Sequence, residues 1–475
     1  MDLGKVSLPS DAYGAISFVN AEGFEVHGIP LHLDRHEVSF ELVSTDGVLR
    51  TSEVLNDFRV RLGERPAYLG QATVTAVTLA GTRTICAASL NEPWVEEAVL
   101  RQDAGNAPAE FDAFLGYWQK NCHVQAGFKV AVADLFTLLS DLEMWLSRVE
   151  LDFDGDAGRD SALRRREWAR KVGERTTSTL NTLFERFEWA ASAAGPDWRP
   201  AHRAFARRQL HPFLLGAPFL HRTFRKPLGY AGDYEMVNMI SRDPLEGSTL
   251  FAQLINVWFL AQPPAQAHRN RLQYLEQKIA DIAVRAIGDR RTARILSLGC
   301  GPAVEVQEFL RQRPYADRVE FTLLDFNQET IERTKTRLTE IKRQCQRHTP
   351  IEFVKKSVMA ILRESNGSPA RSFRDQYDFV YCAGLFDYLT DPVCRRLSTQ
   401  LHEWVRPGGI YLSTNVHTSN PWPLVMDFLM DWHLIYRTAA QLIATRPEQL
   451  AADECVLSSD ATGVNIYLEA KKPER

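Results

Sequence analysis

Short apolar strands alternate with helical segments through residues 286–475, and this alternation most constrains the fold. Strands are predicted at 294–298, 321–324, 351–355, 377–382 and 410–414. Helices are predicted between them at 303–312, 328–343 and 391–405. Such a pattern is typical of an α/β domain in which a parallel sheet carries helices on both faces. Ligands of these sheets lie at the carboxyl ends of the strands, so the residues that follow each strand are the candidates for a site.

Composition narrows the class of protein. The formal net charge of −4 gives no bulk basic surface for nucleic acid, so no nucleic-acid partner is expected. No apolar run is long enough to span a bilayer, and the start of the chain lacks the apolar core of a signal peptide. The seven cysteines form no CxxC pair, which indicates a reducing compartment without structural zinc. We expect a cytoplasmic protein without integral membrane contact.

Residues 1–95 predict a small antiparallel barrel or sandwich. Their β-branched, alternating segments lie at 15–19, 38–43, 72–79 and 84–90, separated by turn signals such as Asp46-Gly47 and Ala80-Gly81. The stretch Leu33–Leu42 and the hairpin rhythm of 63–90 resemble a PilZ domain, a small β-barrel that binds cyclic di-GMP in many bacterial proteins. The Arg-x-x-x-Arg that grips this dinucleotide in the family is absent, so the resemblance implies a degenerate, scaffolding barrel.

Residues 96–285 are predicted to be mainly helical. An apolar stripe repeats at spacings of four and three, which indicates a helix packed lengthwise on another: Phe128, Val132, Leu135, Leu139, Leu142, Leu146 and Val149. A second helix is expected over 163–194, ending at Gly195-Pro196. The pair would serve as a domain core or a dimer face. The acidic segment 152–160 between them fails the EF-hand pattern, because Ala157 and Leu163 stand where glycine and glutamate are needed.

A glycine turn and an acid mark a nucleoside site in the last zone. The first strand runs into Gly299-Cys300-Gly301-Pro302, which lets the backbone approach a ligand closely. The second strand ends at Asp325, whose carboxylate is placed to accept both hydroxyls of a ribose. Val304 occupies the position of the third glycine of the dinucleotide fingerprint, so that motif is absent.

These motifs resemble the class I S-adenosylmethionine-dependent methyltransferases. The matching stretches, in the family's order, are Ile295–Pro302, Leu323–Asn327, Ser357-Val358, Tyr377–Leu385 and Trp404–Leu412, and the tail 454–470 suits the family's reversed closing hairpin. The resemblance implies a Rossmann-like fold, S-adenosyl-L-methionine as cofactor with S-adenosyl-L-homocysteine as product, and no metal. It implies ten cofactor-binding residues: Gly299, Cys300, Gly301, Pro302, Asp325, Phe326, Ser357, Val358, Ala383 and Gly384. Ser357 departs from the family, which often has an acid there.

Candidates for catalysis follow the fourth and fifth strands. Asp387 and Tyr388 follow the fourth strand, and His417 follows the fifth. An exposed His417 is placed to orient a nucleophile or take its proton, although packing or capping explains it equally well. Asp391 is interpreted as the N-cap of the next helix. The polar and aromatic loop after the fifth strand supplies the candidate substrate-binding residues Asn415, Trp422 and Met426.

The segment Gly229–Tyr234 is unusual for a linker, since a glycine-paired turn carries Tyr, Asp and Tyr. We interpret it as a lid, with Tyr230 as a catalytic candidate, Asp233 holding the cofactor's amino group and Tyr234 contacting substrate. A helix-capping turn is the alternative. The basic residues just before it, Arg222, Arg225 and Lys226, would attract an anionic substrate or form a solvated face.

The lid segment, with Gly384–Leu389, resembles bacterial methyltransferases credited with making 3-hydroxypalmitic acid methyl ester. The sequence therefore predicts three domains: a PilZ-like barrel (1–95), a helical lid or dimerisation domain (96–285) and a methyltransferase domain (286–475). The expected activity is methyl transfer to a small molecule, such as the carboxylate of a 3-hydroxy fatty acid, in a homodimer formed through the helices or the barrel. Two alternatives remain: an N- or O-methyltransferase acting on an amine, phenol or hydroxyl, and a sensor with a non-catalytic methyltransferase fold.

Overall fold

The computed structural model describes residues 14–33, 36–43, 49–62, 65–80, 83–91, 115–116, 123–154, 159–364 and 373–474. Its contacts divide the chain into two compact units. The barrel–helix unit comprises Met1–Ala231, Asp243–Ala261 and Trp422–His433, and the sheet unit comprises Gly232–Arg242, Gln262–Pro421 and Leu434–Arg475. The units interleave along the chain, and the boundaries of the three predicted domains remain a prediction.

The sheet unit is built on a seven-stranded sheet in the order β12-β13-β11-β10-β7-β8-β9. Its strands are β7 (Ala293–Leu298), β8 (Val319–Asp325), β9 (Ile351–Lys355), β10 (Tyr377–Cys382), β11 (Val405–Val416), β12 (Cys455–Ser459) and β13 (Asn465–Lys471). Strands β7 to β11 are parallel, whereas β13 runs antiparallel to β11 and to β12. The predicted α/β fold class is confirmed, including the reversed hairpin at its edge.

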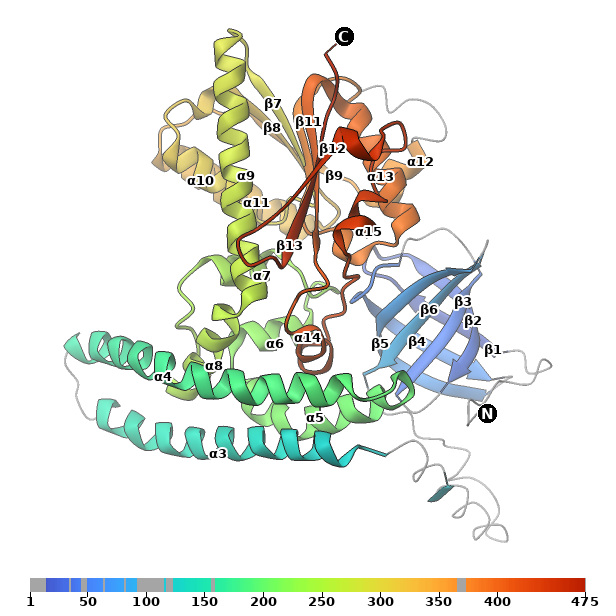
Figure 1. The fold of residues 1–475 in the computed structure, drawn as a ribbon, viewed down its shortest axis with the longest axis vertical. Helices are drawn as coiled ribbons and strands as arrows, with labels where there is room; N and C mark the ends of the chain where they lie inside the picture. The colour runs from blue at the N-terminus through green and yellow to red at the C-terminus, as the bar shows by residue number, and fades with distance from the viewer. Residues whose placement is uncertain are drawn as a thin grey trace. The chain divides into compact units, whose positions relative to one another are not determined.

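Helices cover both faces of this sheet (Figure 1). The helices of the sheet unit are α7 (Tyr234–Ser241), α9 (Pro263–Gly288), α10 (Val304–Gln312), α11 (Gln328–Gln344), α12 (Val358–Glu364), α13 (Asp391–Trp404) and α15 (Ala439–Ile443). Helices α9, α10 and α11 pack on one another and their side of the sheet, while α12 packs on α13 on the opposite side. The core between them consists of buried aliphatic and aromatic residues of the strands and the facing helices.

The barrel of the barrel–helix unit is a closed sheet of six antiparallel strands in the order β1-β2-β3-β6-β5-β4. The strands are β1 (Gly14–Val19), β2 (Glu25–Leu33), β3 (Glu37–Leu42), β4 (Val54–Leu62), β5 (Arg65–Ala80) and β6 (Arg83–Leu90). Closure removes every exposed sheet edge. Phe18, Phe40 and Phe58 fill the interior, with ring centroids 5.7–5.8 Å apart. The sequence therefore predicted the barrel alternative correctly.

Two barrel strands, β2 and β4, are missing from the sequence prediction. Pro30 lies inside β2 next to a shift in its pairing with β3, where the lost N–H is tolerated. Asp57 in β4 has a φ of +48° and lies at a bulge against β5. Both irregularities break the alternation on which the prediction depends. Asp34, Arg35, Asp46, Gly47 and Gly81 lie outside the described residues.

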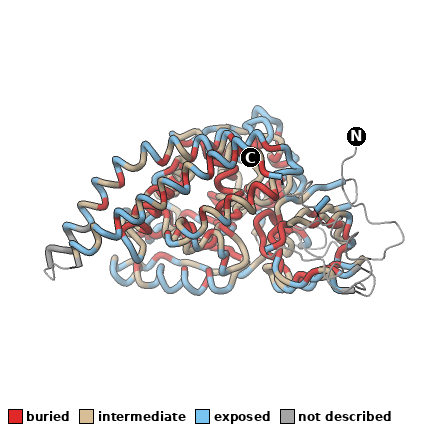
Figure 2. The backbone as a smooth tube through the Cα atoms, turned by 90° about the horizontal axis from the view of Figure 1, so that it is seen from below, coloured by how far each residue is buried: buried red, intermediate tan, exposed pale blue. Residues whose placement is uncertain are grey.

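The helices of the barrel–helix unit pack along their lengths. They are α3 (Ala126–Asp154), α4 (Arg159–Ser192), α5 (Arg199–Leu214), α6 (Pro218–Arg225), α8 (Leu250–Ala261) and α14 (Pro423–Met430). Helices α3 and α4 lie side by side, as predicted, and Figure 2 shows buried and exposed residues alternating along them. The predicted stripe is buried at Phe128, Val132, Leu135, Leu139 and Leu146. Residues 155–158 of the acidic segment lie outside the described residues.

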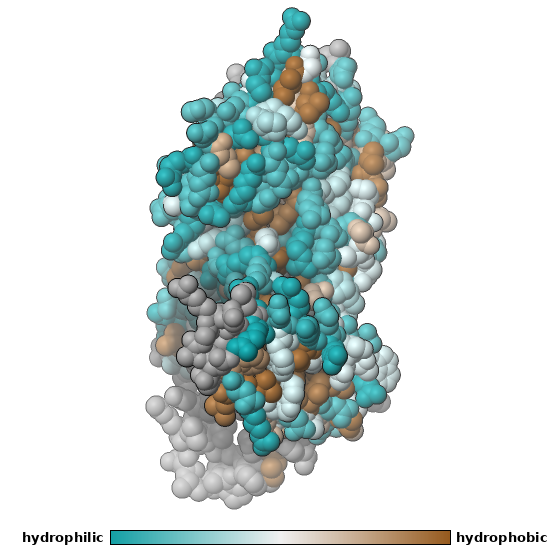
Figure 3. Space-filling view, turned by 90° about the vertical axis from the view of Figure 1, so that its left-hand side faces the viewer, coloured by the Kyte–Doolittle hydropathy of each residue, from teal (hydrophilic) through white to brown (hydrophobic). Residues whose placement is uncertain are grey.

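The face in Figure 3 is mainly hydrophilic, with small apolar areas scattered over it. This distribution agrees with the charged composition of the chain. Within the described ranges, no helix is both long and apolar enough to cross a bilayer.

A glycine at the start of β11 supplies a test of the sheet packing. A Cβ added at Gly409 would lie 2.8 Å from the carbonyl oxygen of Asp378 and 2.8 Å from a methyl group of Val405. Gly409→Ala should therefore lower the free energy of unfolding by about 1–3 kcal/mol, the usual cost of overpacking. Gly288→Ala is the matched control, because a Cβ there meets nothing within 4 Å. Equal midpoints for both variants in chemical denaturation would contradict the packing described.

Candidate functional site

The loop after β7 has a backbone that only glycine adopts easily. Gly299 and Gly301 have φ values of +68° and +51°, in the left-handed region. The N–H groups of Gly299 and Cys300 both donate to the carbonyl of Leu324 on β8, at 2.9 and 3.0 Å. A Cβ built on Gly301 would meet nothing within 4 Å, so the space beside this loop is open. Pro302, which follows, is buried.

Asp325, the last residue of β8, is linked directly to that glycine loop. Its Oδ2 accepts a hydrogen bond from the N–H of Gly301 at 3.1 Å, and its Oδ1 accepts one from Asn327 at 3.0 Å. The side chain is only 6% exposed. These two backbone donors orient the carboxylate at the carboxyl ends of β7 and β8. The ribose hydroxyls of a nucleoside would be further donors to such a carboxylate.

The predicted adenine-side residues lie next to Asp325. Phe326 follows it directly and is half-buried. The N–H of Lys356 donates to the Asp325 carbonyl at 2.9 Å, which holds the end of β9 beside it. Ser357 Oγ accepts from the N–H of Ala360 at 3.3 Å, so this side chain caps α12, and Val358 is 5% exposed.

The thiols near the site are unsuited to nucleophilic chemistry. Burial raises the pKa of Cys300 and Cys382 well above the ordinary value for a thiol, with nearby carboxylates adding to the effect. The thiolate is the reactive form of cysteine, so these residues are inert wall groups. Beyond Cys382, the half-buried Ala383 leads to Gly384, which has a φ of +94° and donates its N–H to Thr414 Oγ1 at 3.1 Å.

Asp387 lies in a short helical turn after β10, over Phe386–Tyr388, and is 4% exposed. Its Oδ1 accepts from the N–H of Val416 at 2.7 Å, and its carbonyl accepts from Ile435 at 2.7 Å. Burial raises the pKa of Asp387 to about 6, against the opposing effect of Arg271. A carboxylate with such a pKa is able to take a proton near neutral pH.

Two parts of the predicted lid pack on the rim of the cofactor region within the sheet unit. A Cβ added at Gly232 would lie 2.6 Å from the hydroxyl oxygen of Tyr388, so the two residues are in close contact. Tyr234 donates its hydroxyl to Glu329 Oε1 at 3.0 Å, in the first turn of α11. The segment thus reaches from the loop after β10 to the helix after Asp325.

Asp233 forms the N-cap of α7, with Oδ1 accepting from Met236 N–H at 2.9 Å. The helix-capping alternative is therefore correct for this carboxylate. Its role toward the cofactor's amino group remains a prediction.

His417 and Asn415 at the end of β11 are engaged by neighbouring groups. The N–H of Ser419 donates to His417 Nδ1 at 3.1 Å, so a neutral ring carries its proton on Nε2. Asn415 donates to the carbonyls of Val416 and Ile435, both at 2.9 Å, and accepts from Arg437 at 2.5 Å. These contacts favour packing roles for both residues.

The expectation that Asp391 caps α13 is wrong by one residue. Thr390 is the N-cap, and Asp391 is the first residue of the helix. The Asp391 carboxylate instead accepts from Nε and Nη2 of Arg437, at 2.9 and 2.7 Å. The Asp391 carboxylate therefore binds the Arg437 guanidinium instead of capping the N–H groups of the helix.

Three predicted residues, Tyr230, Trp422 and Met426, belong to the barrel–helix unit. There Trp422 precedes α14 and its ring lies 6.2 Å from that of Trp258. Met426 is 6% exposed. Lys226, expected to attract a substrate, is 3% exposed with its Nζ 2.5 Å from Asp431 Oδ2 in the same unit. It is a buried ion-pair partner rather than part of a solvated basic face.

Sequence reasoning missed two residues of α9 at the edge of the site. Arg271 and His268 are three positions apart, so they share a helix face, and both are buried. A Cβ added at Gly384 would lie 3.0 Å from Arg271 Nη2, which places the guanidinium against the loop after β10. The sequence signal was the polarity of these two residues on a helix that buries mainly apolar groups, a signal that Glu276 on the same helix also gives.

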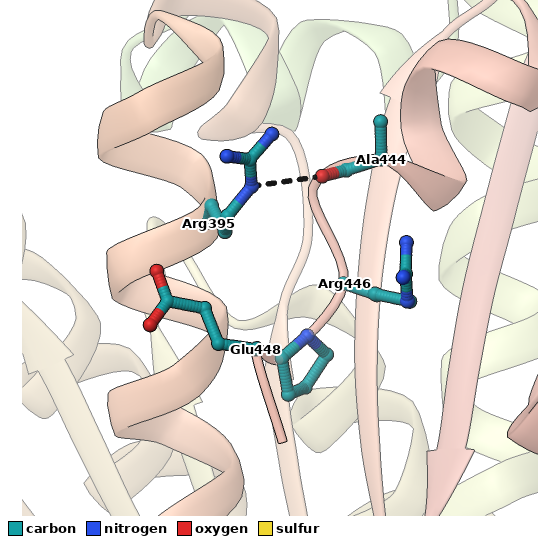
Figure 4. Close-up of a pocket in the computed structure, with 5 residues that line it drawn as sticks. Arg395, Ala444, Arg446 and Glu448 are labelled. Carbon is teal, nitrogen blue, oxygen red and sulfur yellow. Dashed lines mark hydrogen bonds between the residues drawn. The ribbon is translucent and has the colours of Figure 1, made fainter. Parts of the chain in front are cut away.

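A shallow cleft of about 400 Å³ lies elsewhere on the sheet unit (Figure 4). It is lined by Arg395, Ala444, Arg446, Pro447 and Glu448, and Arg395 donates to the Ala444 carbonyl at 3.1 Å. None of these residues lies at a strand end or belongs to the predicted site. No cluster of three metal-ligating side chains occurs in the part of the chain that the structure describes.

Comparison with known proteins agrees with this geometry. Residues 295–409 match the family model of the methyltransferase domain, which spans the glycine loop, Asp325 and the loop after β10. A search of curated proteins gives no significant match.

Solved methyltransferase structures align only in part. Magnesium protoporphyrin IX methyltransferase from Synechocystis PCC 6803 with bound SAH is 11% identical, with a TM-score of 0.31, covering 43% of this chain and 84% of that one. An O-methyltransferase family protein from Burkholderia thailandensis is 14% identical, with a TM-score of 0.31, covering 59% and 74%. The CurJ carbon methyltransferase is 14% identical, with a TM-score of 0.36, covering 61% and 80%. Alignments this partial carry no information on substrate.

The family match covers the strands, the glycine loop and Asp325, which form the candidate cofactor site. The residues of this site fit S-adenosylmethionine, because the oriented carboxylate of Asp325 and the open loop at Gly301 lie together at the strand ends. Residues 295–409 therefore form a methyltransferase domain with a Rossmann-like fold, for which S-adenosylmethionine is the expected methyl donor.

Proposed function

We propose that the protein transfers the methyl group of S-adenosylmethionine to a small-molecule acceptor, with the carboxylate of a 3-hydroxy fatty acid as the preferred candidate. The observation that carries the methyl-transfer assignment is the hydrogen bond from the N–H of Gly301 to Asp325, which joins the two parts of the proposed nucleoside site. The cofactor would supply an electrophilic methyl group. The residues of this chain would hold it and align the acceptor.

The state of the polar groups near the strand ends supports a carboxylate acceptor. The Cys300 and Cys382 thiols are held protonated by burial, and His417 Nδ1 already accepts a hydrogen bond. An acceptor carboxylate is ionised at neutral pH, with a reference pKa of about 4, and needs no base. Alignment of its oxygen with the methyl group would then supply much of the acceleration.

A specific observation keeps the amine, phenol or hydroxyl alternative in view. Asp387 is buried with a pKa of about 6, and is thus a base that such acceptors require. The barrel and helices would serve as scaffold, lid or dimer interface in either case. These roles, like a homodimer, are proposals that follow from the sequence.

The acceptor is tested by incubating the protein with methyl-labelled S-adenosylmethionine and 3-hydroxypalmitate. Labelled methyl ester should form, and 3-hydroxypalmitamide, which lacks the carboxylate, should give none. Ester formation by the Asp325→Ala variant at the normal rate would show that the activity comes from another protein. Transfer of the labelled methyl group to phenols or amines, but not to 3-hydroxypalmitate, would favour the alternative acceptor.

Removing the carboxylate of Asp325 should weaken S-adenosylhomocysteine binding by about 10- to 100-fold, since hydrogen bonds to charged groups contribute about 1.5–3 kcal/mol. Calorimetric titration of Asp325→Ala measures this. Glu320→Ala is the control, because Glu320 lies on the same strand and forms an ion pair with Arg294 at the surface. Unchanged affinity in Asp325→Ala would contradict the cofactor assignment.

The pH profile of kcat/KM separates the two acceptor classes. If Asp387 takes a proton from the acceptor, it must be ionised, so the rate is present above its pKa and falls as pH drops through about 6. With a carboxylate acceptor the profile should stay flat from pH 5.5 to 8. Asp387→Asn should then keep its rate within a few-fold, because the amide oxygen still accepts from Val416. A profile that falls below pH 6 and is abolished by this substitution would overturn the carboxylate proposal.

A further inference from the structure

Arg271 is a buried guanidinium without a charged partner. It is 7% exposed, and its two acceptors are the neutral groups His268 Nδ1, at 2.7 Å, and Asn465 Oδ1, at 3.5 Å. Among the described residues, no carboxylate forms an ion pair with it within 4.0 Å. A guanidinium has five N–H donors, and burying its charge without an opposite charge is costly. The described part of the chain therefore leaves Arg271 incompletely satisfied.

The nearest acids do not provide the missing partner. Arg271 lowers the pKa values of Asp387 and Glu305 to some degree, but burial outweighs this effect and raises both. Each carboxylate also has its own donor: Val416 N–H for Asp387, and the hydroxyl of Tyr381, at 2.7 Å, for Glu305. Both carboxylates therefore accept a hydrogen bond from a group other than Arg271.

Arg271 lies near the switch point of the sheet, where ligands of such folds usually bind. The strand order reverses between β7 and β10, and the crevice of such a sheet opens at this switch point. The guanidinium lies against Gly384, directly after β10. Helix α9 ends just before β7 begins and packs on it, so its earlier turns reach the carboxyl end of that strand.

Two neighbouring donors are also unsatisfied. His268 Nδ1 accepts from Arg271, so the proton of the neutral ring is on Nε2, and this buried atom has no partner in the described part of the chain. The hydroxyl of Tyr467 is likewise buried without a partner there. Burial lowers the pKa of His268 and raises that of Tyr467, and Arg271 adds to the first shift and opposes the second. Tyr467 is two positions from Asn465 on β13, so its side chain lies on the same face of the strand as the amide that Arg271 contacts. Buried polar groups normally have partners, so three incomplete donors in one place indicate a ligand.

We propose that Arg271, with His268 and Tyr467 beside it, is a receptor for one carboxylate in the methyl-transfer crevice. A guanidinium matches a carboxylate with two parallel hydrogen bonds. Two reactants offer this group: the amino-acid end of the cofactor and an acid acceptor. The inference rests on the assigned cofactor, and either source satisfies the same buried charge.

Calorimetric titration of the unaltered protein distinguishes the sources. S-Adenosylhomocysteine is compared with its decarboxylated analogue, which keeps the adenosine, sulfur and amine. In the presence of saturating S-adenosylhomocysteine, 3-hydroxyoctanoate is compared with 3-hydroxyoctanamide. Loss of the carboxylate should weaken binding about 10- to 100-fold in one of the two pairs. Equal affinities within both pairs would overturn the proposal without any variant, whereas no binding of S-adenosylhomocysteine at all would contradict the cofactor assignment instead.

Arg271→Gln should abolish the difference in the pair that shows it, while the carboxylate-free partner keeps its affinity. Lys278→Gln is the matched control, because it removes a cation farther along α9 whose partner is Glu469, 2.8 Å away. Should Arg271→Gln fail to fold, Arg271→Lys keeps the charge but lacks the two-pronged geometry, and should reduce the difference only in part. A carboxylate preference that survives unchanged in folded Arg271→Gln would assign the recognition to other residues.

Discussion

The geometry of the site depends on the buried guanidinium of Arg437, which is 1% exposed. It donates to the carbonyls of Phe386 and Leu389, at 2.7 and 2.6 Å, and to the carboxylate of Asp391. It also donates to Asn415 at the end of β11. One rigid, planar cation thereby joins the loop after β10 to the end of the neighbouring strand. Asp387 lies inside that loop, so its position is set by this network.

Arg271 and Arg437 show two ways in which a protein uses a buried cation. The acceptors of Arg437 all come from the protein, including a carboxylate, and its role is complete without a ligand. The acceptors of Arg271 are two neutral groups, although it lies on the opening of the sheet. Burial of the charge costs desolvation in both cases. The difference in partners is what separates a structural cation from one that recognises a ligand.

The sequence was most informative about candidate site residues that directly follow a predicted strand. Gly301 and Asp325 could be predicted because each ends or follows an apolar strand, and parallel strands bring their carboxyl ends together. The role of Arg271 could not be predicted, because Gly384 and Asn465, which it contacts in the structure, are distant from it in the sequence. The capping of α13 was misplaced because the pairing of Asp391 with Arg437 is equally non-local. Local signals therefore place Gly301 and Asp325 at the strand ends, whereas non-local contacts such as those of Arg271 need the structure.

With a carboxylate acceptor, methyl transfer would need no base and would depend on alignment and on the exclusion of water. The contact of Gly232 with Tyr388, and the hydrogen bond from Tyr234 to Glu329, hold the segment before α7 across the rim of the cofactor region. A side chain at position 232 would push against the Tyr388 hydroxyl, so the small glycine is what allows this close approach. Desolvation there would strengthen the attraction between an acceptor carboxylate and a buried guanidinium. The same burial that makes the charge of Arg271 costly would then make it selective for a carboxylate.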